Sequence, residues 1–250
     1  MNDDKKIQQR IRALLALAND SGASESERQV AFERASAMMA RHAIERLDTA
    51  PTGRADRVVK RHCLDIPGGR STPSYAQTLG LGIIAEAAGM RSTFQDWRKH
   101  RGHPFVRLFL VAFESDIEWF TALASAVVNR TAQGWCAWRR AHADAYRHWS
   151  ASERLYTRNG YVEGFARGVA ELVEASRAQA VSDPGRGGRA LIVRTREQEV
   201  EAFYNDLDLV DGKPCMVDDA AYSRGVIDGR NSGLSGATTV TRGAARRITQ

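Results

Sequence analysis

Two tripeptides of the chain place basic residues directly after tryptophan, and both suit contact with a nucleic acid. They are Trp97-Arg98-Lys99 and Trp138-Arg139-Arg140. A guanidinium group pairs bidentately with phosphate and stacks on rings, and an indole ring can stack on a base. The pattern predicts a nucleic-acid-binding surface, although a tryptophan on a helix usually belongs to the core and a GC-rich genome also favours arginine over lysine. The phosphate contacts that we expect are Arg98, Lys99, Arg101, Arg139 and Arg140.

Positive charge is distributed unevenly along the 250 residues, which hold 36 Lys and Arg against 30 Asp and Glu, a net charge of +6. Residues 51–63 have a net charge of +3, and residues 91–107, 130–158 and 224–250 have +4 each. These segments sum to +15, so the rest of the chain is acidic by nine. Segregated arginine favours a polyanionic partner, provided that the cations converge on one face of the folded chain.

Metal chemistry is a weaker alternative. His100 and His103 form an H-x-x-H motif, but a zinc site would need one or two further ligands. Glu114 and Asp116 lie where a strand is expected to end and a helix to begin, and the helix dipole alone can account for carboxylates there. We therefore treat His100, His103, Glu114 and Asp116 as weak metal candidates, and a metal-dependent hydrolase as the second alternative function.

Motifs of common enzyme classes are missing from the sequence. It contains no Walker phosphate loop, no G-x-S-x-G elbow and no H-E-x-x-H motif. Gly80-Leu81-Gly82 lacks the third glycine of a dinucleotide-binding turn and is interpreted as helix packing. We expect no catalytic residue and no cofactor, so the chain leans towards a non-enzymatic role.

The N-terminus has the pattern of a helical hairpin. Residues 5–18 place apolar side chains on one helical face, a turn follows, and Ser24 with Glu27 has the spacing of a capping box. A second apolar helix comes after it. The eight basic and eight acidic residues of positions 1–50 cancel, so this hairpin is better suited to packing or docking a protein partner than to binding phosphate.

This hairpin resembles a known domain family. A K-I-x-x-L-L-x-L-A-like pattern in residues 5–18, a Ser/Gly turn and the segment ERASAMMARH resemble a family of unknown function found in bacteria, plasmids and phages. The resemblance covers residues 5–47, and the remainder is similar in layout to the segment that often follows this hairpin. It implies a bacterial or mobile-element origin and brings no established activity.

Beyond a linker at residues 50–53, the pattern predicts an α+β fold in which helix predominates. Strands are expected at 57–66, 91–97 and 105–113, the last two forming a hairpin through a loop at 99–104. Helices are expected at 74–88, 115–143, 149–181, 196–207 and 217–231. The resulting domains are a hairpin at 1–48, an α+β domain with a small βαββ sheet at 54–232, and a basic tail at 233–250.

Our leading interpretation is a nucleic-acid-binding accessory protein of a bacterium or phage, with DNA favoured over RNA. The alternative is an adaptor or inhibitor that binds a host or defence protein, through the N-terminal hairpin. Three scattered cysteines suit a reducing cytoplasm. The sequence has no apolar run long enough to span a bilayer, so no membrane partner is expected.

Overall fold

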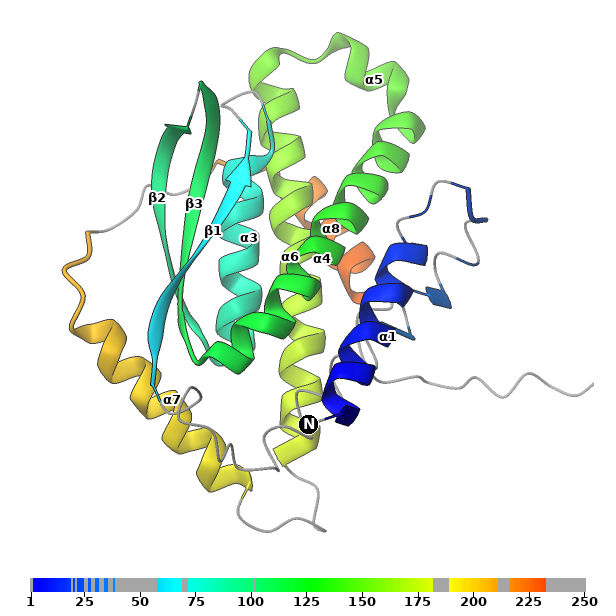
Figure 1. Ribbon diagram of the computed structural model, residues 1–250. Coiled ribbons are helices and arrows are strands. Elements are labelled where there is room, and N and C mark those ends of the chain that lie inside the picture. Colours follow the sequence, from blue (N-terminus) through cyan, green and yellow to red (C-terminus); the bar gives the residue numbers. More distant parts are fainter. Residues whose placement is uncertain are drawn as a thin grey trace, which may run out of the picture.

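The computed structural model describes residues 2–18, separate positions between 20 and 38, and residues 58–68, 72–100, 102–181, 189–210 and 216–232. It confirms a helix-dominated α+β fold (Figure 1). The elements in chain order are α1 (Asn2–Ala18), β1 (Lys60–Pro67), α3 (Ser74–Ala87), β2 (Arg91–His100), β3 (His103–Ala112), α4 (Glu114–Ala141), α5 (Ala143–His148), α6 (Ala151–Val181), α7 (Arg189–Asn205) and α8 (Asp219–Arg230).

The three strands form one antiparallel sheet in the order β1-β3-β2. The central strand β3 alternates strictly. Val106, Leu108 and Leu110 are at most 2% exposed and belong to the core, whereas Phe105 and Phe109 are partly exposed on the opposite face. Helix α3 packs against the core face of all three strands. We call the opposite side the outer face of the sheet.

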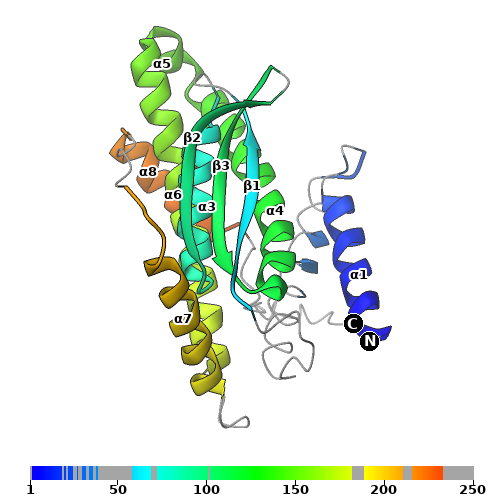
Figure 2. The same ribbon diagram turned by 60° about the vertical axis from the view of Figure 1, so that its left-hand side comes forward.

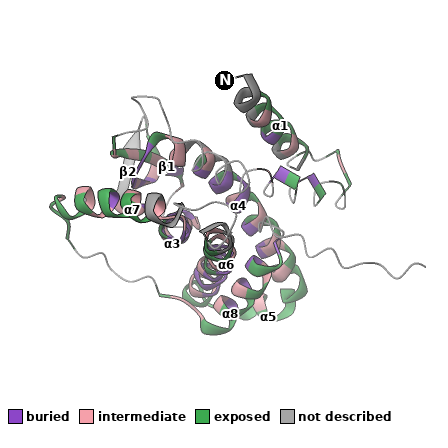
Figure 3. Ribbon diagram, turned by 90° about the horizontal axis from the view of Figure 1, so that it is seen from below, coloured by how far each residue is buried: buried purple, intermediate pink, exposed green. Residues whose placement is uncertain are grey.

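The core lies between the sheet and the long helices. Seen from below, buried residues gather where α3, α4 and α6 face one another (Figure 3). Phe120 on α4, and Tyr161 and Val169 on α6, are fully buried, as their helical spacing predicted. Gly80 of α3 allows close approach to α6, because a Cβ there would lie 2.7 Å from that of Ala166, which confirms the helix-packing interpretation.

Helices α6 and α8 approach through glycine. Cβ atoms on Gly160, Gly164 and Gly168 would collide with the backbone of α8 or of the residue that precedes it. Gly225 and Gly229 present the reciprocal surface to the backbone of α6. Both helices therefore carry small residues at a four-residue spacing, an arrangement that the sequence analysis did not identify.

Several predicted bounds were wrong. The strands of the hairpin extend to His100 and begin at His103, so residues 99, 100, 103 and 104 are strand and not loop. Gly102 has a φ of +86°, which an L side chain rarely adopts, and it allows a connection of two residues. The helix expected at 115–143 ends at Ala141 and is followed by the short α5, and α7 begins at Arg189, seven residues before its predicted start.

The N-terminal segment is described in part. Helix α1 is present, and the backbone N–H of Glu27 donates to Ser24 Oγ while Ser24 N–H donates to Glu27 Oε2, which confirms the capping box. Most of the second predicted helix, the linker at 50–53 and the tail at 233–250 lie outside the described residues. Within the described part of the chain, no helix combines the length and apolar character needed to cross a bilayer.

Candidate nucleic-acid interface

Two of the basic segments singled out by sequence emerge at the same end of the molecule. Strand β2 leads to the turn at residues 101–102, β3 runs back from it, and α4 returns towards the same end. Figures 1 and 2 both place the β2–β3 turn and α5 at this end. We call it the arginine end and define it as residues 98–103 together with residues 138–154.

A stack of rings supports the helical half of the arginine end. The Trp135 and Trp138 rings are 5.2 Å apart and 12° from parallel, and His142 stacks on Trp138 at 4.1 Å and 16°. The innermost ring, Trp135, is 9% exposed and contacts Tyr161 in the core. This agrees with the alternative interpretation of the sequence, in which a tryptophan on a helix belongs to the core. The outermost, His142, is exposed, and its Nδ1 lies 2.8 Å from the carbonyl oxygen of Trp138.

Helix α5 is attached to this stack by aromatic and arginine contacts. Its Tyr146 lies 5.5 Å from Trp149, and Trp149 lies 6.1 Å from Trp138. Arg154 of α6 donates hydrogen bonds to the carbonyl oxygens of Tyr146 and Arg147 and lies 5.1 Å above the Tyr146 ring. Arg154 therefore holds the connection between α5 and α6.

Arg139 and Arg140 are exposed in the last turn of α4, where cations interact favourably with the helix dipole. The Arg139 guanidinium lies 6.0 Å from the Tyr146 ring, and Arg140 Nε donates to the carbonyl oxygen of Cys136 at 3.3 Å. Neither forms a salt bridge with a carboxylate of the residues that the structure describes. Both guanidinium groups thus keep charge and donors for an external anion.

For the hairpin half of the arginine end, the structure describes the course of the backbone. Arg98 and Lys99 of β2 lie opposite Phe105 and Pro104 of β3, and His100 lies opposite His103. The side chains of Arg98, Lys99 and His100 are not described, and Arg101 lies outside the described residues. The register brings Arg98 and Lys99 to the last positions of β2, beside the turn.

Four arginines elsewhere in the basic segments are paired with carboxylates. The pairs, with their N–O distances, are Arg91–Glu201 at 2.6 Å, Arg107–Asp65 at 2.6 Å, Arg224–Asp228 at 3.0 Å and Arg230–Glu171 at 2.5 Å. Hydrogen bonds from Arg91 lower the pKa of Glu201, and those from Arg230 lower the pKa of Glu171. These cations stabilise the fold, so segment charge alone overstates the cationic surface.

The predicted carboxylate candidates for a metal are paired with cations. Glu114 lies 3.3 Å from Lys60 Nζ, and Asp116 accepts a hydrogen bond from Arg196 at 2.8 Å. Among the described side chains, no three His, Cys, Asp or Glu residues gather into a potential metal site. His103 is exposed at the start of β3.

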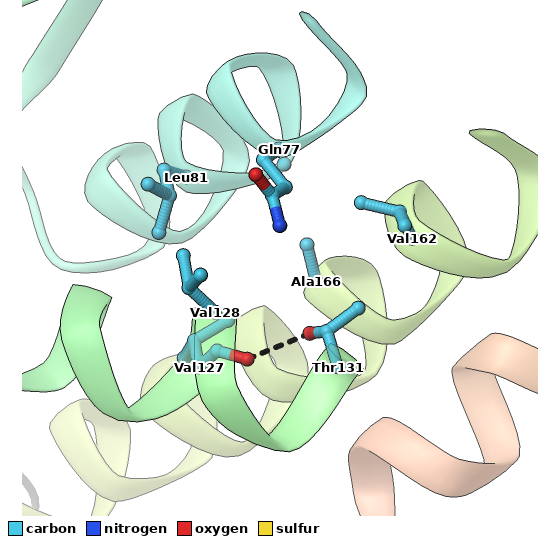
Figure 4. A pocket seen from close by; sticks show the side chains of 8 residues that line it. Gln77, Leu81, Val127, Val128, Thr131, Val162 and Ala166 are labelled. Atoms are coloured by element: carbon cyan, nitrogen blue, oxygen red, sulfur yellow. Dashed lines mark hydrogen bonds between the residues drawn. The ribbon is translucent and has the colours of Figure 1, made fainter. Parts of the chain in front are cut away.

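Two of the hollows in the described part of the chain differ in size and exposure. The first, between α3, α4 and α6, holds about 10 Å³ and is lined mainly by apolar groups, with the Thr131 hydroxyl bonded to the Val127 carbonyl (Figure 4). That volume is too small for a small-molecule ligand. The second, of about 320 Å³, is an open groove at the N-terminal segment, where Leu17 and Val30 are each 43% exposed.

Sequence analysis missed a second group of arginines beside aromatic rings. Arg61 lies 4.8 Å above Phe109, and Arg107 lies 5.1 Å above Phe105. The signal was present in the alternation of FVRLF at residues 105–109, which places Phe105, Arg107 and Phe109 on one face of a strand.

Comparison with known proteins bears on the N-terminal segment alone. A family described as "Protein of unknown function (DUF2786)" matches residues 6–46, which confirms the resemblance found in the sequence. No curated protein and no solved structure matches the chain significantly.

Proposed function

We propose that the protein is a nucleic-acid-binding accessory protein, cytoplasmic in a bacterium or phage-infected cell, that contacts phosphates through the arginine end. DNA is the favoured ligand. The observation that carries the proposal is that the β2–β3 turn and the end of α4 both lie at one end of the molecule, on opposite sides of it, with Arg139 and Arg140 exposed on the α4 side. Arg98 and Lys99, at the last positions of β2, extend the same end from the hairpin side, and Arg101, which follows them in the sequence, is a further expected contact.

The chemistry of this end suits a phosphate backbone. Exposed guanidinium groups donate several hydrogen bonds in a planar fork, and the Arg139 guanidinium lies beside the Tyr146 ring, which packs on Trp135. Each phosphate neutralised releases condensed counterions, so affinity must fall steeply with salt concentration. Salt dependence is therefore the property that distinguishes this function from apolar docking.

The first prediction concerns Arg139 and Arg140. Arg139→Gln with Arg140→Gln removes two phosphate contacts, so affinity for a labelled oligonucleotide, offered as a single strand and as a duplex, should fall. The slope of log affinity against log salt should become shallower by about two. Fluorescence anisotropy across a salt series measures both quantities.

The matched control is Arg10→Gln with Arg12→Gln, which removes the same charge from exposed positions of α1. This variant should keep the wild-type slope. Absence of binding to both the single strand and the duplex at low salt, or equal losses in the two double variants, would overturn the proposed function.

A protein-docking role is the second candidate, and the groove beside Leu17 and Val30 favours it. The groove has Glu27 and Arg34 in its lining, so it offers an apolar floor with one charge of each sign. Partner capture that survives nuclease treatment would separate this role from the first.

A further inference from the structure

The outer face of the sheet carries two aromatic rings beside guanidinium groups, next to the arginine end. We infer that this face stacks the bases of a single-stranded nucleic acid, an inference that rests on the proposed function and names its substrate class. Phe105 and Phe109 would receive the bases, and Arg61 and Arg107 would stack on or beside them.

The contacts on this face come from two neighbouring strands. Arg61 of β1 lies 4.8 Å above the Phe109 ring, and Arg107 of β3 lies 5.1 Å above the Phe105 ring. Asp65, opposite Arg107 in register, accepts two hydrogen bonds from it at 2.6 and 2.8 Å. Asp65 neutralises the charge of Arg107 and fixes its position. Because Arg61 adds a second positive charge, the three side chains together have a net charge of +1.

The upper part of the outer face is open among the described elements. Helix α7 packs on the lower part, where Val200 joins Val111 and Phe113 in a separate buried cluster. Figure 2 shows the sheet in front of α3 with α7 at its lower end. Phe105 and Phe109 are partly exposed, and Arg61 and Asp65 are exposed.

The arrangement favours a single strand over a duplex. Duplex bases are already stacked within the double helix, whereas the bases of a single strand are free to stack on protein rings. Strand β3 also connects this face to the β2–β3 turn, so a nucleic acid bound to the arginine end by its phosphates can continue along the sheet. Positive charge beside aromatic rings is complementary to a polyanion with planar bases.

Cys63 provides a direct reporter of occupancy. It is an exposed free thiol on β1, directly opposite Phe109 in register. In a chain carrying Cys136→Ser and Cys215→Ser, saturating single-stranded oligonucleotide should slow its modification by a thiol reagent at least several-fold. A duplex of equal length should protect it much less.

The matched control adds Cys63→Ser and Ser223→Cys to that background, which moves the reporter to an exposed position of α8. Its modification should be insensitive to either oligonucleotide. Protection of both thiols, or of neither under saturating single strand, overturns the inference.

Ring substitutions test the energetics. Phe105→Leu and Phe109→Leu keep apolar bulk on the sheet but remove the stacking surface, so each should weaken single-strand binding on the order of tenfold. The salt slope should be unchanged, because no phosphate contact is lost. Thermal unfolding of each variant shows whether the sheet remains intact, and the Cys63 measurement needs no change to the rings.

The two proposals fail differently. No salt-dependent binding of any oligonucleotide refutes the proposed function. Salt-dependent binding that depends on Arg139 and Arg140, but leaves Cys63 reactive and ignores the ring substitutions, refutes the stacking inference alone.

Discussion

Glu163 of α6 is a carboxylate held where ionisation is unfavourable. Its Oε2 is buried and has no hydrogen-bond partner among the described residues, and burial raises the pKa of the side chain. The raised pKa means that the folded state binds the proton more tightly than the unfolded state. Glu163 therefore opposes folding above its folded-state pKa, and the penalty fades as pH falls to below the unfolded value.

Glu163→Gln should raise the free energy of unfolding at neutral pH by about 1 kcal/mol, because it removes a buried charge that lacks a partner. The gain should shrink as pH falls through the raised pKa, where the wild-type side chain is itself neutral. Urea unfolding at several pH values measures this difference. Glu174→Gln, an exposed position on the same helix, should show no comparable gain; a pH-independent gain at Glu163 would contradict the argument.

The sequence located the basic segments, but it did not predict which arginines pair with a carboxylate and which remain exposed. Arg107 pairs with Asp65, which is 42 residues away, and Arg91 pairs with Glu201, which is 110 residues away. Such partners depend on strand register and helix docking, which local pattern does not encode. The exposure of Arg139 and Arg140, in contrast, followed from their place in the last turn of an amphipathic helix.

At the scale of elements, the contact between α6 and α8 depends on glycine residues, which have no side chain to keep the two helices apart. The backbones approach closely because glycine occupies positions 160, 164 and 168 on one helix and 225 and 229 on the other. Asp218 caps the start of α8 by accepting from Ala221 N–H at 2.8 Å, and the Tyr161 hydroxyl donates to Asp228 at 2.7 Å across the interface. Close backbone packing and these polar contacts fix α8 on α6.

Gly164→Ala should lower the free energy of unfolding by roughly 1–3 kcal/mol, because the new Cβ collides with the Tyr222 carbonyl. Alanine has the better helix propensity by about 1 kcal/mol, so destabilisation here would show that packing dominates. Chemical denaturation followed by circular dichroism gives the value. Ala175→Leu adds more volume at an exposed position of the same helix and should be nearly neutral; a stable Gly164→Ala variant would refute close packing.

Helices and strands were largely predictable, and their contacts were not. The apolar periodicity of residues 115–143 and 149–181 located α4 and α6, since core-facing positions repeat every 3.6 residues. The four-residue glycine spacing of α6 could also be read from sequence, but its partner, α8, could not. The prediction of a loop at residues 99–104 was wrong, because a turn that includes Gly102 permits the two strands to pair as far as His100 and His103.

At the scale of the whole molecule, the two ends of the sheet differ in what lies beside them. The β2–β3 turn belongs to the arginine end, while the opposite end of the sheet is covered by α7. Polar contacts hold α7 in place beside a small apolar cluster, with Arg91–Glu201, Arg177–Glu197 and Arg196–Asp116 as the ion pairs. The boundary of the open outer face is therefore set by an apolar cluster together with these ion pairs.

Arg196 is the most protected of these cations. Its side chain is 17% exposed, it lies 3.8 Å above the Phe113 ring, and it pairs with Asp116 at the start of α4. Arg196→Gln should lower the free energy of unfolding by about 1–2 kcal/mol, because Asp116 loses a charged hydrogen bond. Since the contact joins α7 to the rest of the molecule, the effect should be concentrated in α7.

Hydrogen exchange read by mass spectrometry tests that localisation. Amides of residues 189–205 should exchange faster in Arg196→Gln, while those of α6 and α8 keep their protection, because the glycine contact between those helices is independent of α7. Arg194→Gln, at an exposed position two residues away, should leave α7 unchanged. Faster exchange spread evenly over the chain would mean that α7 is part of one cooperative unit with the core, and the expected difference between the α6–α8 centre and the α7 edge would be wrong.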